Sequence, residues 1–252
     1  MSTSVDLEQR IALRSKGRKL HIDLKRMRYA NQMLMESIPQ CNRRRVLYVG
    51  IGHGHDALLN LLEGNVQRIV GVDPYLGNGG KGEKDYKELL GLIEHYGLQE
   101  RIDIVRTTIQ EFLKTNETLY DLVVMNDVLH HMFVTKLPLS RSELFESTVE
   151  FFKSLEGRVS DSGVMVISDV QRTGIRPWLS RVRVLRGNVN YSTKQNWYEW
   201  RRAADETSWV FTLCKKYLPW ALRKYGVLCF GSLGLYTVSA RYYLYFRRNR
   251  DV

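Results

Sequence analysis

Short apolar runs alternate along the chain with segments in which apolar residues recur every three or four positions. The short runs predict buried strands, whereas the recurrence predicts amphipathic helices. Strands are predicted at residues 46–49, 68–73, 102–105, 122–125, 164–167, 209–213 and 242–246. Helices are predicted at residues 18–38, 84–96, 142–155 and 196–207, with another that opens near residue 57. This alternation is typical of an α/β fold with a parallel sheet, which binds ligands at the carboxyl ends of its strands.

The first predicted strand runs into a glycine-rich turn. Gly50, Gly52 and Gly54 follow the strand at alternate positions and precede the helix that opens near residue 57. Glycines at such a turn let the backbone approach a ligand closely and point free N–H groups at it. The second strand ends in Asp73, whose carboxylate can accept hydrogen bonds from both hydroxyls of a ribose. The two features together predict a nucleoside-binding site.

The spacing of the glycines distinguishes between nucleoside cofactors. The dinucleotide fingerprint is G-x-G-x-x-G, whereas the third glycine here comes one residue early and His55 stands where that fingerprint has its last glycine. A cofactor without a pyrophosphate therefore fits better than NAD, and a nicotinamide-dependent oxidoreductase is disfavoured.

With these motifs the chain resembles the class I S-adenosylmethionine-dependent methyltransferases, over roughly residues 45–170. The similar motifs lie at residues 49–54, at Asp73, at residues 120–131 and at residues 162–169. The resemblance implies an α/β fold with a doubly wound, mostly parallel seven-stranded sheet in the order 3-2-1-4-5-7-6, the last strand antiparallel, and helices on both faces. The family commonly has acids where this chain has Tyr48 and Thr108.

The resemblance also implies S-adenosyl-L-methionine as the cofactor. The expected cofactor-binding residues are Gly50, Ile51, Gly52, Gly54, Asp73, Pro74, Thr108, Ile109, Asn126 and Asp127. The catalytic candidates are His131, His130 and Asp127. The two histidines are candidates because imidazole titrates near neutrality and can act as a general base. The alternative for both histidines is structural packing. His53 and His55 have no carboxylate or thiol cluster nearby in the sequence, so we expect no metal site.

Charge is unevenly distributed along the 252 residues, whose net charge is +11. Residues 1–45 hold 11 Lys and Arg against 4 Asp and Glu, residues 172–252 hold 16 against 4, and the residues between them hold 11 against 19. We expect a basic helical cap at residues 1–44 and a methyltransferase domain at residues 45–252, with substrate-binding elaborations at about 172–207 and 216–240. The basic flanks favour a small-molecule substrate that carries a carboxylate or phosphate.

Other functions and partners stay open at this point. The basic flanks also suit RNA, although residues 126–129 lack the Asn/Asp-Pro-Pro-aromatic motif of enzymes that methylate exocyclic amines of bases. An aminopropyltransferase of the same fold and a non-catalytic protein of the membrane surface are further alternatives. Residues 225–240 form an uncharged run too short to span a bilayer, which we interpret as a buried or dimer-forming segment, with peripheral membrane contact as the alternative. The three unclustered cysteines and the lack of a secretory signal predict a cytoplasmic protein.

Overall fold

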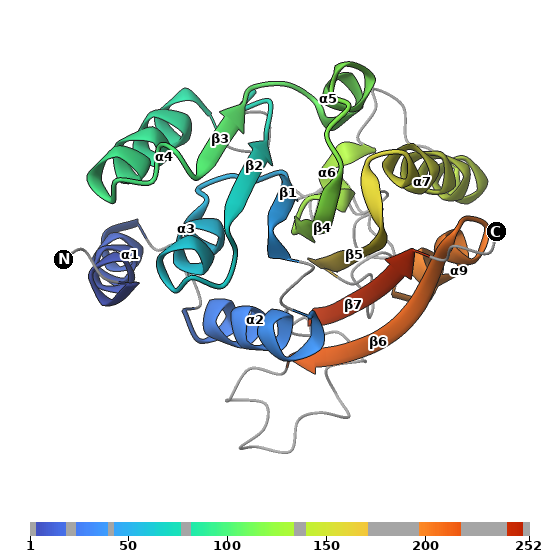
Figure 1. Ribbon diagram of the computed structural model, residues 1–252, viewed down its shortest axis with the longest axis horizontal. Helices are drawn as coiled ribbons and strands as arrows, with labels where there is room; N and C mark the ends of the chain where they lie inside the picture. Colours follow the sequence, from blue (N-terminus) through green and yellow to red (C-terminus); the bar gives the residue numbers. More distant parts are fainter. Residues whose placement is uncertain are drawn as a thin grey trace, which may run out of the picture. The chain divides into compact units, whose positions relative to one another are not determined.

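The computed structural model describes residues 4–18, 24–39, 43–76, 82–133, 140–170, 197–217 and 241–248 (Figure 1). The arginine-rich stretch at residues 172–186 and the uncharged run at residues 225–240 lie outside these described residues, as does most of both predicted elaborations. The chain divides into two compact units, Met1–Val123 and Val124–Val252.

The strands form one seven-stranded sheet in the order β3-β2-β1-β4-β5-β7-β6. Their bounds are β1 Arg45–Val49, β2 Arg68–Val72, β3 Ile102–Val105, β4 Tyr120–Asn126, β5 Val159–Val170, β6 Trp209–Tyr217 and β7 Arg241–Arg248. Strand β2 pairs in parallel with both β1 and β3, whereas β7 is antiparallel to both β5 and β6. The predicted strand order and the antiparallel last strand are confirmed.

The N-terminal unit combines the first three strands with α1 Ser4–Arg18, α2 Leu24–Ser37, α3 His55–Leu62, α4 Glu83–His95 and α5 Ile109–Thr115. Helices α1, α2 and α3 pack against one another. Leu7 and Ile11 of α1 and Met27 and Leu34 of α2 are buried. The helix predicted over residues 18–38 therefore corresponds to α2, and α1 is an additional helix. The predicted boundary of a separate cap at residue 44 stays a prediction.

A buried hydrogen-bond network joins α2, α3 and β1, the strand that leads into the glycine turn. The amide nitrogen of Asn60 donates to Oδ1 of Asn31 at 3.1 Å and to the phenolic oxygen of Tyr48 at 3.0 Å. The Oδ1 atom of Asn60 accepts from Asn65 at 3.2 Å. Burial raises the pKa of the Tyr48 phenol well above its usual range, so this residue stays neutral. Where the family commonly has an acid, this chain has an uncharged member of a polar network.

The C-terminal unit contains α6 Leu129–Met132, α7 Arg141–Glu156 and α9 Trp197–Asp205 together with strands β5, β6 and β7. Its core is aromatic, with Phe152, Trp200, Trp209 and Phe246 almost completely buried. The indole N–H of Trp209 donates to the carbonyl oxygen of Phe152 at 3.1 Å, which satisfies its polar atom inside this core. The predicted helices at residues 142–155 and 196–207 correspond to α7 and α9. Within the described ranges, none of the helices has the length and apolar character needed to cross a membrane.

The network of Asn60 makes a testable prediction about stability. Replacement of Asn31 by Ala removes the acceptor of a buried amide, and we expect the free energy of unfolding to fall by about 1–3 kcal/mol. The matched control is Gln32→Ala in the same helix, because the Gln32 amide bonds to Glu36 at the surface. We expect that control to cost less than about 0.5 kcal/mol. Urea denaturation measures both, and equal losses would contradict the buried network.

Candidate methyl-donor and acid–base sites

The glycine turn after β1 has three residues in the left-handed region of backbone conformation. The φ angles of Gly50, Gly52 and Gly54 are 69°, 55° and 64°. A side chain is strained in this conformation, which explains why glycine occupies each of the alternate positions. At Gly54 a further reason applies, because an added Cβ atom would lie 2.6 Å from Cδ1 of Leu89 in α4. Gly71 of β2 is packed as tightly, because an added Cβ atom there would lie 2.4 Å from Cδ1 of the buried Ile51.

Asp73, which follows β2, holds the turn in place. Its Oδ2 atom accepts a hydrogen bond from the N–H of Gly52 at 3.1 Å, and its Oδ1 atom accepts from the N–H of Tyr75 at 2.9 Å. Each carboxylate oxygen has more than one lone-pair site and can accept more than one hydrogen bond. Asp73, which was predicted to accept the ribose, is therefore oriented by the turn itself. Pro74 lies between Asp73 and Tyr75 in the chain.

Tyr75 completes the same arrangement and was not among the predicted site residues. Its φ angle is 51°, which is unusual for a bulky residue, and it is buried with 4% of its surface exposed. Its hydroxyl donates to the carbonyl oxygen of Gly52 at 2.7 Å. Burial, and after it the charge of Asp73, raises the pKa of this phenol, so it stays a hydrogen-bond donor. The peptide groups of Gly52 are therefore held from both sides. No sequence pattern marks Tyr75 for this role.

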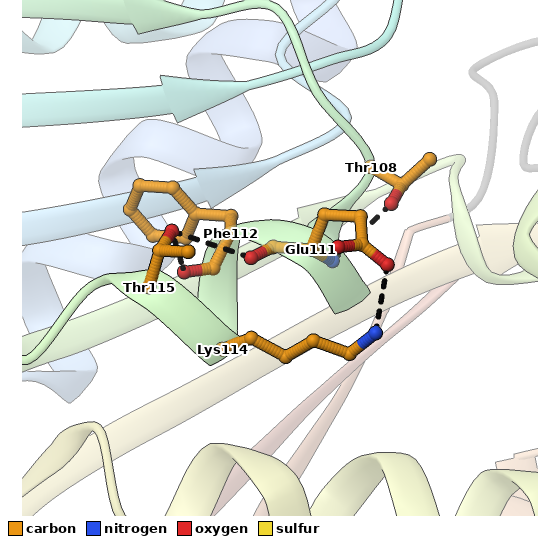
Figure 2. Close-up of polar contacts among 5 residues, drawn as sticks. All are labelled: Thr108, Glu111, Phe112, Lys114 and Thr115. Atoms are coloured by element: carbon orange, nitrogen blue, oxygen red, sulfur yellow. Dashed lines mark hydrogen bonds and ion pairs between the residues drawn. The ribbon is translucent and has the colours of Figure 1, made fainter.

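Thr108 begins α5 as its N-cap. Figure 2 shows its hydroxyl oxygen accepting from the N–H of Glu111 at 3.3 Å, with Lys114 paired to the carboxylate of Glu111 at 2.8 Å. Ile109, the first residue of the helix, is buried. The departure from the family's acid is thus explained locally, because threonine caps a helix well and its hydroxyl hydrogen can still donate to a ligand.

His53 of the turn has a carboxylate partner that lies far from it in the sequence. Nδ1 of His53 lies 3.3 Å from Oδ1 of Asp85 in the first turn of α4, and the imidazole rings of His53 and His55 stack with centroids 5.3 Å apart. Within the described ranges, no group of three or more His, Cys, Asp or Glu residues is arranged to hold a metal ion.

In the C-terminal unit, the residues that follow β4 are bound to the end of β5. Asn126 is the last residue of β4, and Asp127 has a φ angle of 56°, a conformation that aspartate tolerates better than most residues. The N–H of Asp127 donates to the carbonyl oxygen of Ser168 at 2.7 Å. This bond fixes the direction in which the chain leaves β4.

A buried histidine–aspartate pair lies at the same place. Nδ1 of His130 is 2.5 Å from Oδ1 of Asp169, and the N–H of His130 donates to Oδ2 at 3.0 Å. Both residues are buried, whereas His131 is exposed, although its ring lies 3.9 Å from that of His130. Nδ1 of His130 is thus paired with the carboxylate, and in the tautomer that donates from Nδ1 the ring's lone pair lies on Nε2. Asp169, the last residue of the motif at residues 162–169, was not among the predicted site residues.

The predicted residues thus fall into two groups. The glycine turn, Asp73, Pro74, Thr108 and Ile109 belong to the N-terminal unit, where Tyr75 joins them. His130, His131, Asn126 and Asp127 belong to the C-terminal unit, where Asp169 joins them.

A family model described as a methyltransferase domain matches residues 21–227. The chain belongs to this methyltransferase family. S-adenosylmethionine is accordingly the methyl donor. Membership favours the methyltransferase over the nicotinamide-dependent oxidoreductase, the aminopropyltransferase and the non-catalytic membrane protein. A comparison with curated proteins gives no match.

Several solved structures share the fold. The cyclopropane synthase MmaA2 from Mycobacterium tuberculosis has a TM-score of 0.61 at 9% identity, over 87% of this chain and 83% of that chain. The YcgJ protein from Bacillus subtilis has a TM-score of 0.59 at 12% identity, over 89% and 100%. The magnesium protoporphyrin IX methyltransferase from Synechocystis PCC 6803, solved with bound SAH, has a TM-score of 0.57 at 14% identity, over 89% and 82%.

Some of the similar chains are longer than this methyltransferase. It spans 56% of the length of a Nostoc punctiforme protein, with a TM-score of 0.53 and 12% identity. It likewise spans 53% of the mitomycin 7-O-methyltransferase MmcR, with a TM-score of 0.54 and 13% identity. These likenesses show the class I fold.

The geometry of the turn predicts the effect of a methyl group at Gly54. Both Gly54 and Gly97 have φ of 64°, but a Cβ atom at Gly97 meets nothing within 4 Å. We expect Gly97→Ala to lower the free energy of unfolding by about 1–2 kcal/mol through backbone strain alone. Gly54→Ala should lose about 1–3 kcal/mol more, because it also collides with the buried Leu89. Chemical denaturation of both variants tests this, and a Gly54→Ala variant no less stable than Gly97→Ala would contradict the tight packing.

Proposed function

We propose that this methyltransferase transfers the methyl group of S-adenosylmethionine to an oxygen or nitrogen atom of a small molecule that carries a carboxylate or phosphate. The observation that carries the proposal is the buried pair of His130 and Asp169. An oxygen or nitrogen nucleophile must lose a proton as it gains the methyl group, and a positioned base lowers the barrier of that step. The basic flanks of the chain support an anionic acceptor.

The residues of the N-terminal unit suit the adenosine part of the cofactor. The left-handed glycines leave backbone without side chains at the turn, and Asp73 is held with both oxygens oriented. In this proposal Asp73 accepts the ribose hydroxyls, while Thr108 and Ile109 border the adenine. Asn126 and Asp127 stay predicted contacts of the methionyl part. The cofactor supplies a methyl group that is already activated on a sulfonium, so the protein mainly orients the reactants and excludes water.

The proton has a defined path in this proposal. Nε2 of His130 accepts the proton of the acceptor hydroxyl or amine while the new bond to the methyl carbon forms and the bond from that carbon to sulfur breaks. The imidazole becomes an imidazolium, and Asp169 stabilises its charge through Nδ1. The other oxygen of Asp169 accepts the backbone N–H of His130, which holds the carboxylate beside the ring. His131 lacks the buried position that would orient it in this way.

Binding of S-adenosylhomocysteine tests the cofactor site. At 100 times its dissociation constant, the ligand should add roughly 2.7 kcal/mol to the stability of the native protein, seen as a raised melting temperature, whereas NAD should add little. Asp73→Asn should weaken binding about tenfold or more, because a charged acceptor is lost. Asp103→Asn is the matched control, since Asp103 lies on the next strand and pairs with Arg68 at the surface. A shift with NAD and none with S-adenosylhomocysteine would refute the proposal.

Three substitutions test the base. His130→Gln and Asp169→Asn should lower kcat by about 10²–10⁴ without weakening the binding of S-adenosylhomocysteine, whereas His131→Gln should keep near-native turnover. Release of S-adenosylhomocysteine is measured with an acceptor selected from a panel of hydroxy and amino carboxylates and their phosphate counterparts. Loss of turnover in His131→Gln but not in His130→Gln would contradict the proposal, because it would show that His131 is the base.

A further inference from the structure

A cavity of about 320 Å³ lies between the first turn of α7 and α9, within the C-terminal unit. Its walls combine two guanidinium groups, two aromatic rings, a carboxylate, a hydroxyl and an apolar side chain. The lining residues are Arg141, Ser142, Leu144, Phe145, Tyr198, Glu199 and Arg202. The volume is at the lower end of the range of small-molecule sites, so the cavity suits a single ring or a short chain.

The topology places this cavity toward the carboxyl ends of β5 and β6. The carboxylate of Glu156, at the end of α7, accepts the N–H of Ser208, which precedes β6, at 2.7 Å. The C-terminal ends of α7 and α9 are therefore both held near the beginnings of strands. Helix α7 has 16 residues, or roughly 24 Å at 1.5 Å per residue, so its first turn lies far from the start of β5. The carboxyl end of β5 bears Asp169, the partner of His130.

Among the described residues that line the cavity, Arg202 is the cation without a carboxylate partner. Its guanidinium lies over the ring of Phe145, 4.8 Å from the centroid, and no carboxylate in the described part of the chain pairs with it. Stacking fixes the plane of the guanidinium and leaves the N–H groups at its edge able to bind a planar anion. Arg141 differs, because it lies 3.6 Å from the carboxylate of Glu199. At the start of α7, the N–H groups of Ser140 and Glu143 are engaged by the capping box that these two residues form.

We propose that this cavity binds the carboxylate of the acceptor molecule, with Arg202 as its anchor and Phe145 as the platform that orients the guanidinium. The inference rests on the proposed function, whose acceptor it narrows from carboxylate or phosphate to a monocarboxylate. Among the described lining residues, Glu199 offsets one of the two cations, which leaves an excess of one positive charge. That excess suits a monoanion better than a doubly charged phosphate. The exposed ring of Tyr198 and the buried Leu144 favour a flat apolar body behind the carboxylate.

Benzoate is the probe for this site, and benzamide is its neutral counterpart. Calorimetric or NMR titration of the full chain with benzoate should show saturable binding that weakens as salt is added, and benzamide should bind at least about tenfold more weakly. Arg202→Gln should raise the dissociation constant of benzoate about tenfold. Arg201→Gln is the matched control, because Arg201 is on the same helix and stacks over a different ring, that of Phe211 at 4.9 Å. We expect it to change binding less than about twofold.

The outcomes separate this inference from the proposed function. Equal binding of benzoate and benzamide, absence of benzoate binding, or equal effects of the two arginine substitutions would overturn the carboxylate site. S-adenosylhomocysteine binding is measured in the same samples and should be unchanged in both variants. If that ligand fails to bind the wild-type protein, the proposed function fails whatever benzoate does. Melting temperatures of the two variants, each of which loses one cation–π contact, show whether a fold defect contributes.

Discussion

The hydrogen bonds of Asp73 and Tyr75 to Gly52 are the constraint on which the glycine turn of the N-terminal unit depends. Gly52 donates its N–H to Asp73 and offers its carbonyl to the hydroxyl of Tyr75. Asp73 in turn accepts the N–H of Tyr75, so the three residues close a ring of hydrogen bonds around a turn that is otherwise costly in backbone conformation. The conformation of the turn is therefore fixed by its own hydrogen bonds, and the carboxylate proposed to bind the ribose is part of the same ring.

The C-terminal unit uses the same principle for a different chemistry. The segment after β4 is tied to the last residues of β5 by the backbone bond of Asp127 and by the two bonds between His130 and Asp169. One buried carboxylate therefore contacts both the backbone and the ring of His130. In the proposed function, this arrangement favours His130 over the exposed His131 as the base.

Much of this architecture could be predicted because it depends on local patterns. Apolar runs gave the strands, the resemblance gave their order, and glycine spacing with an acid at the next strand end located Asp73. The pairing of His130 with Asp169 was missed, since it joins residues whose proximity only tertiary structure creates. Asn31 recurs with the apolar residues of α2, and its bond to Asn60 of another helix accounts for a polar residue on that face. Tyr75 was missed because no periodicity signals a left-handed tyrosine.

Tyr48 has a consequence for how the protein responds to acidity. A carboxyl group behind the glycine turn would change its charge as the solution became acidic, and the electrostatic potential felt by a bound sulfonium would change with it. The phenol that stands there is buried, shares its oxygen with an amide, and gains or loses no charge across that range. The contribution of Tyr48 to the electrostatic potential is therefore constant, and any dependence of donor binding on pH has to originate from other groups.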